Sequence, residues 1–309
     1  MSATNNMINL PIAAVERDTG LGKDTLRVWE RRYGFPRPLR DANGDRLYPA
    51  DQVARLRHIK RLMDKGHRPG KLLALGSEEL AALSERAFEG QGPWSRGVHT
   101  EELSAYLEDC RLHRIVSLRT GLMEAMARRG LRDFVLEIAA PLVTAVGDCW
   151  ERGTFQVYEE HLFTEVLQNV LRVGIAGIPA SGHSGPVIVL TTFPQEQHSI
   201  GLLMAEAIFT LEGAHCVPLG VSLPVADIAR AAGQADVVAL SFSIASNTQQ
   251  MLAGLSELSA TRPPGVELWC GGTAVGLARC SLPGLRHVDL ATAGEQVAEW
   301  RRRAGKPGP

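Results

Sequence analysis

An imidazole stands after an apolar run in the second half of the chain, where it could ligate a metal. Residues 187–201 read VIVLTTFPQEQHSIG: a strand-like stretch, a polar loop with Glu196 and His198, and Gly201 in the opening turn of a helical pattern. In open α/β sheets, ligands bind in the crevice beyond the carboxyl ends of the strands, so a histidine there can ligate a group bound above the sheet. A histidine beside a helix start is also a common capping or solvated residue, and position alone does not decide between these roles.

Small residues end two later strand-like runs. Ser241 and Ser243 close the third run, and Gly271 and Gly272 close the fourth; taken singly, both pairs are ordinary turn residues. Together with Glu-x-His-x-x-Gly after the first run, they resemble cobalamin-binding Rossmann-like domains, whose signature is Asp-x-His-x-x-Gly and whose histidine is the lower axial ligand of cobalt. The change from Asp to Glu keeps the carboxylate. The resemblance implies a cobalamin site with His198 as the metal ligand and with Glu196, Gly201, Ser241, Ser243, Gly271 and Gly272 around it.

The elements that must position these residues alternate in type. Strand patterns occur near 186–192, 215–219, 236–242, 266–270 and 287–291, and helical patterns separate them. Alternation of this kind predicts a doubly wound, parallel, Rossmann-like sheet. No GxGxxG motif follows the first strand, which argues against a dinucleotide as the ligand.

The N-terminal segment has the charge of a polyanion binder. The whole chain has a net charge of −1, yet residues 1–75 hold 15 Lys/Arg and 8 Asp/Glu. Helical patterns over 11–20 and 22–33, joined by a glycine-containing turn, predict a helix-turn-helix. Asn43-Gly44 is a two-residue hairpin signal and makes 39–40 and 46–48 the strands of a small wing, which an amphipathic helix over 50–66 follows. A solvated basic face would carry the same charge, so charge alone does not establish DNA binding.

The run RVWERRYGFPRPLRDANGDRLYPADQVARLRHIKRL closely resembles the winged-helix domain of MerR-type transcriptional regulators. That family reads operator DNA with the second helix and grips the backbone with the wing. We expect Trp29 in the core and Glu30 orienting neighbouring arginines. In most of that family a long coiled-coil helix makes the dimer; its pattern is missing after this wing, so we expect oligomerisation through downstream domains. The expected DNA contacts are Lys23, Thr25, Arg27, Arg31, Arg32, Arg40, Arg46 and Tyr48.

Between these two regions, residues 99–180 carry no strand signals. Breaks in the apolar periodicity predict a four-helix bundle with helices near 100–110, 112–129, 131–152 and 155–176. Within it stands CWERGTFQVYEEH, in which nine residues separate Trp150 from Glu160-His161. A buried tryptophan and a carboxylate on a helix surface need no ligand.

The spacing nevertheless resembles the helical cap of CarH/LitR-type photoreceptors, MerR relatives that carry a cobalamin domain. In that family the tryptophan packs on the upper adenosyl group and the Glu-His pair contacts it, which implies these roles for Trp150, Glu160 and His161. Some members have a histidine directly after the tryptophan, which captures cobalt after photolysis. Here that position is Glu151.

Composition is that of a soluble globular protein, with 45% hydrophobic and 22% charged residues. No apolar run approaches the roughly 20 residues of a membrane span, and the polar N-terminus is no secretory signal, so we expect a cytoplasmic protein. The five scattered cysteines form no CxxC pair of the kind that holds structural zinc or performs redox chemistry.

The expected fold class is multidomain α and α/β. The sequence predicts a winged-helix DNA-binding domain over 1–77, a linker over 78–98, the four-helix-bundle cap over 99–180 and the Rossmann-like cobalamin domain over 184–305. The expected protein is no enzyme but a DNA-binding regulator, and by resemblance a repressor, controlled by adenosylcobalamin. Light would act through cobalt–carbon photolysis and dissociation of a homodimer or tetramer.

Two alternatives stay open. A regulator of the same fold that lost cobalamin, or that binds another tetrapyrrole or a protein partner, is compatible with Glu196 and Glu151, because the axial ligand and the groups around it decide which metal centre is held. A corrinoid enzyme subunit shares the cap and the cobalamin domain. Such proteins require a substrate barrel or a catalytic partner, whereas the remaining residues of this chain are predicted to form a DNA-binding domain.

Overall fold

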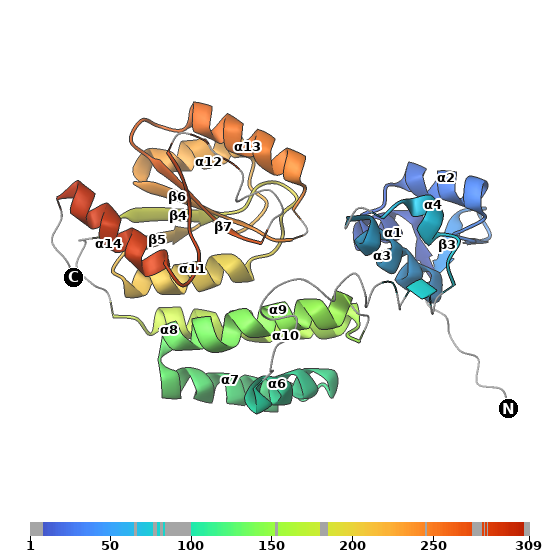
Figure 1. Cartoon of the computed structure of the whole chain (residues 1–309), viewed down its shortest axis with the longest axis horizontal. Helices are drawn as coiled ribbons and strands as arrows, with labels where there is room; N and C mark the ends of the chain where they lie inside the picture. Colours follow the sequence, from blue (N-terminus) through green and yellow to red (C-terminus); the bar gives the residue numbers. More distant parts are fainter. Residues whose placement is uncertain are drawn as a thin grey trace. The chain divides into compact units, whose positions relative to one another are not determined.

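The computed structural model describes residues 9–64, 67–76, 79–80, 83, 100–151, 154–179, 185–244, 246–273, 280, 282 and 284–305 (Figure 1). The chain divides into two compact units, 1–98 with 147–156 and 99–146 with 157–309. The predicted linker over 78–98 lies almost wholly outside the described residues. In the described part of the chain, no helix is both long and apolar enough to cross a membrane.

Two short helices open the first unit, as predicted. Helix α1 (Ile12–Thr19) ends at Gly20 and helix α2 (Lys23–Tyr33) ends at Gly34, and both glycines adopt the left-handed conformation, with φ of 67° and 65°. Their N–H groups donate to the carbonyl groups of Glu16 and Glu30, which satisfies one carbonyl in the last turn of each helix. The glycine-containing turn between the helices gives the predicted helix-turn-helix.

The wing is a hairpin of β2 (Leu39–Arg40) and β3 (Arg46–Pro49), at the predicted positions. Its turn is longer than the predicted two-residue loop. The Asp41 carboxylate accepts hydrogen bonds from the N–H groups of Asn43 and Asp45, at 2.9 and 2.8 Å, and so stabilises a wider loop with Gly44 at a φ of 82°. A further strand, β1 (Asn9–Pro11), pairs with β3 and was not predicted, because three residues give no readable alternation.

Helix α3 (Ala50–Asp64) and the short helix α4 (Pro69–Leu72) complete this unit. The amphipathic pattern predicts that Val53, Leu56, Ile59 and Met63 share the buried face of this helix. The first three are fully buried, but the fourth fully buried residue is Leu62, and Met63 is only partly buried. These residues pack with Leu26 and Trp29 of α2, so the expectation that Trp29 belongs to the core is confirmed.

The second unit begins with the helical bundle. Its described helices are α6 (Glu101–Arg111), α7 (Ile115–Arg129), a continuous segment of α8 (Leu131–Asp133), η1 (Phe134–Ala139) and α9 (Ala140–Glu151), and α10 (Val157–Ala176). The end of α9, from residue 147 on, is counted with the first unit. The four predicted helices are confirmed within a few residues. Segment η1 is a π-helical turn, which the apolar pattern did not reveal.

The parallel sheet has the order β5-β4-β6-β7-β8, with β4 (Val187–Thr191), β5 (His215–Pro218), β6 (Val237–Phe242), β7 (Glu267–Gly272) and β8 (Leu285–His287). Strand β8 lies earlier than the predicted 287–291. Its three residues pair with β7, the Val288 N–H donates to the Cys270 carbonyl, and the chain then turns at Asp289 towards the last helix.

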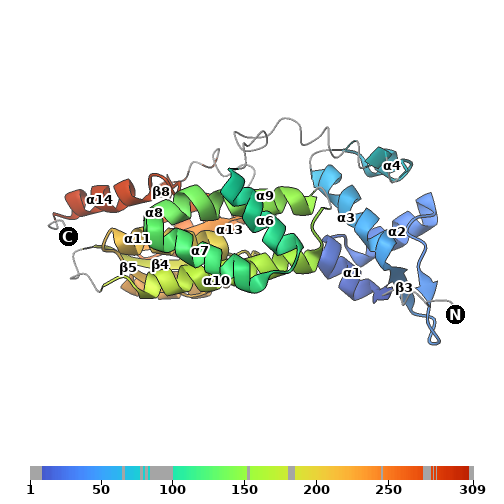
Figure 2. The ribbon, with the colours of Figure 1, turned by 90° about the horizontal axis from the view of Figure 1, so that it is seen from below.

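Helices cover both faces of the sheet (Figure 1). Helices α12 (Val225–Ala231) and α13 (Thr248–Thr261) bury one face, while α11 (Ile200–Leu211) and α14 (Ala293–Ala304) cover the other. Helix α11 also packs against α10, so the bundle lies on this outer layer (Figures 1 and 2). An ion pair of Arg132 with Glu212 joins α8 to the end of α11, beneath Gly294, where a Cβ would meet both side chains.

Candidate functional site

The loop that carries His198 lies at the topological switch point of the sheet. Strand β4 pairs with β5 on one side and with β6 on the other, so the chain leaves β4 and β6 in opposite lateral directions. Ligands of open α/β sheets bind in the crevice at this point. The His198 side chain is 62% exposed there.

One ring nitrogen of His198 is held by Glu196. Nδ1 donates to Glu196 Oε1 at 2.5 Å, and the His198 N–H donates to the same oxygen at 3.1 Å. The hydrogen bond to Glu196 raises the pKa of His198 against the opposing effect of burial, and the charges of Glu196 and Glu160 add to this shift. With Nδ1 occupied, Nε2 is the nitrogen left to face a metal, and binding there displaces its proton.

Glu196 also reaches across the switch point to the loop after β6. Its Oε2 accepts from the Ser243 N–H at 3.0 Å, from the Ser243 hydroxyl at 2.8 Å and from the Ser246 hydroxyl. Burial would raise the pKa of this carboxyl group, but the hydrogen bonds from His198, Ser246 and Ser243 outweigh it and lower the pKa to about 2. Glu196 is therefore a buried carboxylate that ties the two loops together.

Ser246 was not predicted as a site residue. It is a third serine, after Ser241 and Ser243, close to the end of the third strand, and this clustering could have indicated its role. Thr192 and Ser222 were missed as well: both hydroxyls donate to the Glu196 carbonyl, at 2.6 and 3.1 Å. They fix the backbone of the loop from β4 and from the neighbouring β5–α12 connection.

Three predicted glycines around the strand ends pack closely against neighbouring protein atoms. A Cβ at Gly201 would stand 2.5 Å from Ser241 Oγ, one at Gly271 would stand 2.7 Å from the Val288 carbonyl oxygen, and one at Gly272 would overlap the Phe242 carbonyl. Backbone carbonyl groups exclude a side chain at Gly271 and Gly272, and Gly272 has a φ of 112°. The predicted residues Glu196, His198, Gly201, Ser241 and Ser243 thus gather on the adjoining ends of β4 and β6, with the glycine pair at the end of β7.

The donor set suits a metal that brings its own ligands. In the part of the chain that the structure describes, no three His, Cys, Asp or Glu side chains are grouped so that they could hold a metal ion. A single imidazole with a fixed Nδ1 could still hold the cobalt of a corrin, because the corrin brings four nitrogen ligands of its own. His198 and its surroundings therefore fit cobalamin.

The bundle presents its predicted pair at the start of α10. Glu160 accepts a hydrogen bond from the Thr164 hydroxyl at 2.9 Å, and its charge acts on His198, so it lies within electrostatic reach of the imidazole. Nδ1 of His161 lies 3.5 Å from Oε2 of Glu160, and the His161 side chain is 70% exposed. Trp150 lies in the last turn of α9 and is partly buried, and the side chain of Glu151 lies outside the described residues.

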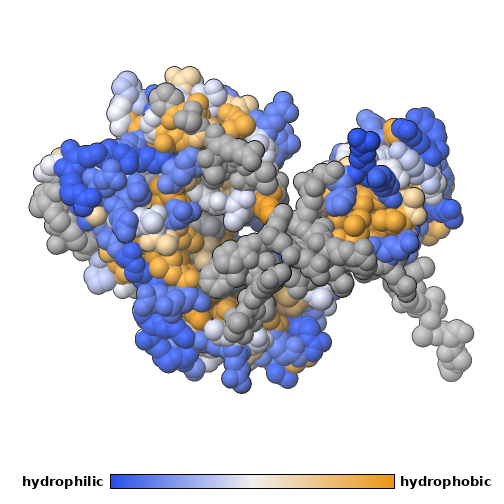
Figure 3. Space-filling view, viewed as in Figure 1, coloured by the Kyte–Doolittle hydropathy of each residue, from blue (hydrophilic) through white to orange (hydrophobic). Residues whose placement is uncertain are grey.

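The candidate DNA surface consists of α2 and the wing. Hydrophilic residues gather over α2 on the face in Figure 3. Arg31 and Arg32 are exposed, Lys23 and Thr25 are half-buried, and Arg27 pairs with Asp24. In the wing, Arg40 donates to the Gly44 carbonyl at 2.7 Å and Arg46 donates to Glu30 at 2.7 Å.

Glu30 thus holds a wing arginine, as predicted. The hydrogen bond from Arg46 to Glu30 raises the pKa of Arg46, so its charge is secure. The expectation for Tyr48 is corrected: its side chain is entirely buried in the core of the first unit, so it packs between β3 and the helices instead of facing DNA.

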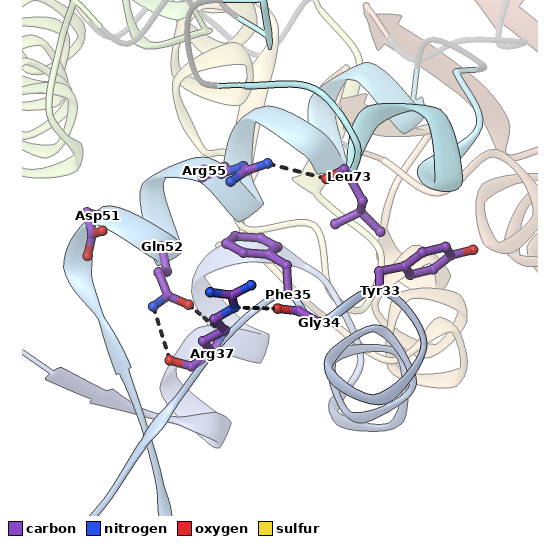
Figure 4. A pocket seen from close by; sticks show the side chains of 8 residues that line it. All are labelled: Tyr33, Gly34, Phe35, Arg37, Asp51, Gln52, Arg55 and Leu73. Atoms are coloured by element: carbon purple, nitrogen blue, oxygen red, sulfur yellow. Dashed lines mark hydrogen bonds between the residues drawn. The ribbon is translucent and has the colours of Figure 1, made fainter.

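A hollow of about 480 Å³ opens beside the end of α2 (Figure 4). The Gln52 amide exchanges two hydrogen bonds with the Arg37 backbone, and Arg55 stacks 4.4 Å from the centre of the Phe35 ring while it donates to the Leu73 carbonyl. These polar groups brace α3 against the end of α2 and against α4. The hollow is lined by Tyr33, Gly34, Phe35, Arg37, Asp51, Gln52, Arg55 and Leu73.

Two family models match separate parts of the chain. Residues 10–72 match the MerR HTH family regulatory proteins, and residues 101–173, the helical bundle, match the B12 binding domain.

Two relatives are similar in sequence to most of the chain. The HTH-type transcriptional repressor CarH of Myxococcus xanthus is 32% identical over 263 residues, which are 82% of this chain and 86% of that protein. CarA, a second HTH-type transcriptional repressor of the same organism, is 30% identical over 76% of this chain and 77% of its own length. Among solved structures, the monomethylamine corrinoid protein of Methanosarcina barkeri shares the fold over 63% of this chain and 96% of its own, with a TM-score of 0.54 at 15% identity.

Proposed function

Because the chain belongs to the CarH-like family of MerR-type transcriptional regulators with a B12-binding domain, we propose that it is a repressor controlled by adenosylcobalamin. The observation that supports cofactor control best is the imidazole of His198 at the switch point, with Nδ1 fixed by the buried Glu196. This arrangement prepares Nε2 to bind cobalt. The regulator role follows from the family, and no catalytic group is needed for it.

The remaining site residues receive roles in this proposal. Glu196 orients the ligand imidazole, and Ser243 holds Glu196. The small residues Gly201, Ser241, Gly271 and Gly272 admit the corrin and its nucleotide tail close to the backbone. Glu160 and His161, together with Trp150, contact the upper ligand of the cofactor.

We assign operator binding to basic and polar residues of α2 and the wing. A single winged helix covers one half-site, so a symmetric oligomer that binds two half-sites gains affinity through effective concentration. Phosphate contacts also make the affinity fall steeply with salt. The proposed contacts are Lys23, Thr25, Arg27, Arg31, Arg32, Arg40 and Arg46.

Light control is the second part of the proposal. Bound adenosylcobalamin supplies a cobalt–carbon bond that visible light cleaves. Glu160 and His161 would then lose a bound group, and a ligand can shift an assembly equilibrium only through such differential contacts. We expect the oligomer to dissociate and the operator to be released. Glu151 is a poorer partner for this cobalt than imidazole, so the light product should hold its cobalamin less firmly.

The test is the elution volume and operator retention of protein loaded with adenosylcobalamin, before and after green light. The proposal expects a larger species and a DNA complex in the dark, and loss of both in the light. His198→Ala serves as the control, with cobalamin binding followed by absorbance. Unchanged elution and retention would leave a cobalamin sensor without light control, and an unchanged spectrum in His198→Ala would refute the ligand assignment.

A further inference from the structure

The turn between α6 and α7 contains a histidine in the left-handed region of backbone conformation. His113 has a φ of 54°, in the left-handed region that residues with a Cβ rarely adopt. Such a backbone persists only where surrounding contacts fix it. Two contacts of the His113 ring lead to the start of α10, and a third contact with the same helix comes from a neighbouring cysteine.

The first contact is with a buried carboxylate. His113 Nε2 donates to Glu159 Oε1 at 3.2 Å, and the Glu159 side chain is only 8% exposed. The other two contacts surround it. The His113 ring lies 5.3 Å from the Tyr158 ring, and the thiol of Cys110, three residues before His113, donates to the Glu159 carbonyl at 3.2 Å.

The position of Glu159 determines where its neighbours point. Successive side chains on an α-helix diverge by about 100°, so a residue fixed into the bundle sets the direction of the next two. Glu159 lies on the buried face of α10 with Phe163 and Val166. Glu160 accordingly turns towards Thr164 and comes within electrostatic reach of His198, while His161 is exposed.

We propose that His113 is a positioning residue for the upper side of the cofactor site, because it fixes Glu159 and thereby the direction of Glu160 and His161. The inference rests on the proposed function, in which these two residues contact the adenosyl group. His113 itself touches no part of the cofactor. His113 affects how strongly the site prefers adenosylcobalamin over cobalamins with other upper ligands. The binding of cobalt by His198 does not depend on His113.

The experiment compares affinities for adenosylcobalamin and hydroxocobalamin in the full chain, measured by absorbance in the dark. Hydroxocobalamin needs His198 but offers no adenosyl group to Glu160 and His161. His113→Gly removes the imidazole and also relieves the left-handed backbone, so folding is not put at risk by strain. We expect the ratio of adenosyl to hydroxo affinity to fall on the order of tenfold, the usual worth of one hydrogen bond to a charged group, with hydroxocobalamin affinity unchanged.

Two further variants separate positioning from general stability. His113→Asn tolerates the left-handed conformation and can donate to Glu159, so it should recover part of the ratio. Glu108→Ala breaks the exposed pair with Arg111 on the same helix end and should leave the ratio unchanged. Amide hydrogen exchange of residues 157–166 without cofactor should be faster in His113→Gly than in either variant.

An unchanged ratio in His113→Gly overturns the inference, and so does an equal loss of both affinities. Measurements on the unmodified protein, by contrast, test the proposed function itself. If that protein binds no cobalamin, or shows no preference for the adenosyl form, then Glu160 and His161 hold no adenosyl group and His113 has no cofactor role. A lower ratio together with faster exchange supports the inference.

Discussion

Replacing Glu196 with Gln tests whether this side chain ties the two loops at the switch point. The carboxylate is 6% exposed and accepts from two groups of His198, two of Ser243 and one of Ser246. An amide of the same shape replaces one accepting oxygen by an N–H₂ donor. The hydroxyl groups can rotate to accept from it, and the imidazole can change tautomer, but backbone N–H groups cannot adapt.

The expected cost follows from that count. If the amide nitrogen takes the Oε2 position, the Ser243 N–H loses its acceptor; if it takes the Oε1 position, the His198 N–H does. Either way one buried backbone donor is left unpaired, which costs about 1–3 kcal/mol. The imidazole also loses its charged acceptor, which lowers the affinity for a metal on its other nitrogen by about 10–100-fold.

Urea unfolding of the protein without cofactor measures the first effect, and titration with hydroxocobalamin measures the second. Gln197→Ala is the control, because this neighbouring side chain is exposed. A Glu196→Gln variant with the unfolding free energy and the cobalamin affinity of the unmodified protein would show that the hydrogen bonds to Glu196 do not organise the site.

Two further substitutions test other parts of the structure. Glu30→Ala frees Arg46, so the ratio of operator to random-sequence affinity in DNA titrations should fall about fivefold, on the order of 1 kcal/mol; Asp45→Asn, which removes an exposed charge from the wing loop, should raise both affinities alike. Gly272→Ala forces a Cβ into the Phe242 carbonyl and should lower the urea-unfolding free energy by about 3 kcal/mol or more. Gly265→Ala also has a positive φ but open space around it, and a loss as large there would mean that strain, not the overlap, is responsible.

Regular periodicity made most of the fold predictable from the sequence. The helices of the bundle and four of the five parallel strands lie within a few residues of the expected ranges, because each buries one face or both. Strand β1 was not predicted, because a run of three residues is too short to show an alternating apolar pattern. The wing turn differed because the Asp41 carboxylate competes for backbone N–H groups, an interaction that the Asn-Gly pair does not reveal.

At the candidate site, residue types were predictable but their partners were not. The motif located His198 and Glu196, since a two-residue spacing after a strand brings both into one loop. The contacts of Glu196 with Ser243 and Ser246 join positions 47 and 50 residues apart, which only the register of β4 with β6 brings together. Tyr48 was misassigned because a resemblance names positions in a wing without stating which face of the strand each occupies.

The π-helical turn η1 has a consequence for how chain length can vary. At its end the Ala140 N–H donates to the Val135 carbonyl, five residues back instead of four. The segment from Leu131 to Glu151 therefore contains one residue more than an uninterrupted α-helix of the same course would need. Removing one residue between 134 and 139 should convert this turn to α-helix while the residues before and after it keep their faces. A one-residue deletion elsewhere in the segment would rotate everything beyond it by about 100°. Homologous chains are thus free to differ by a single-residue gap at this turn without repacking the bundle.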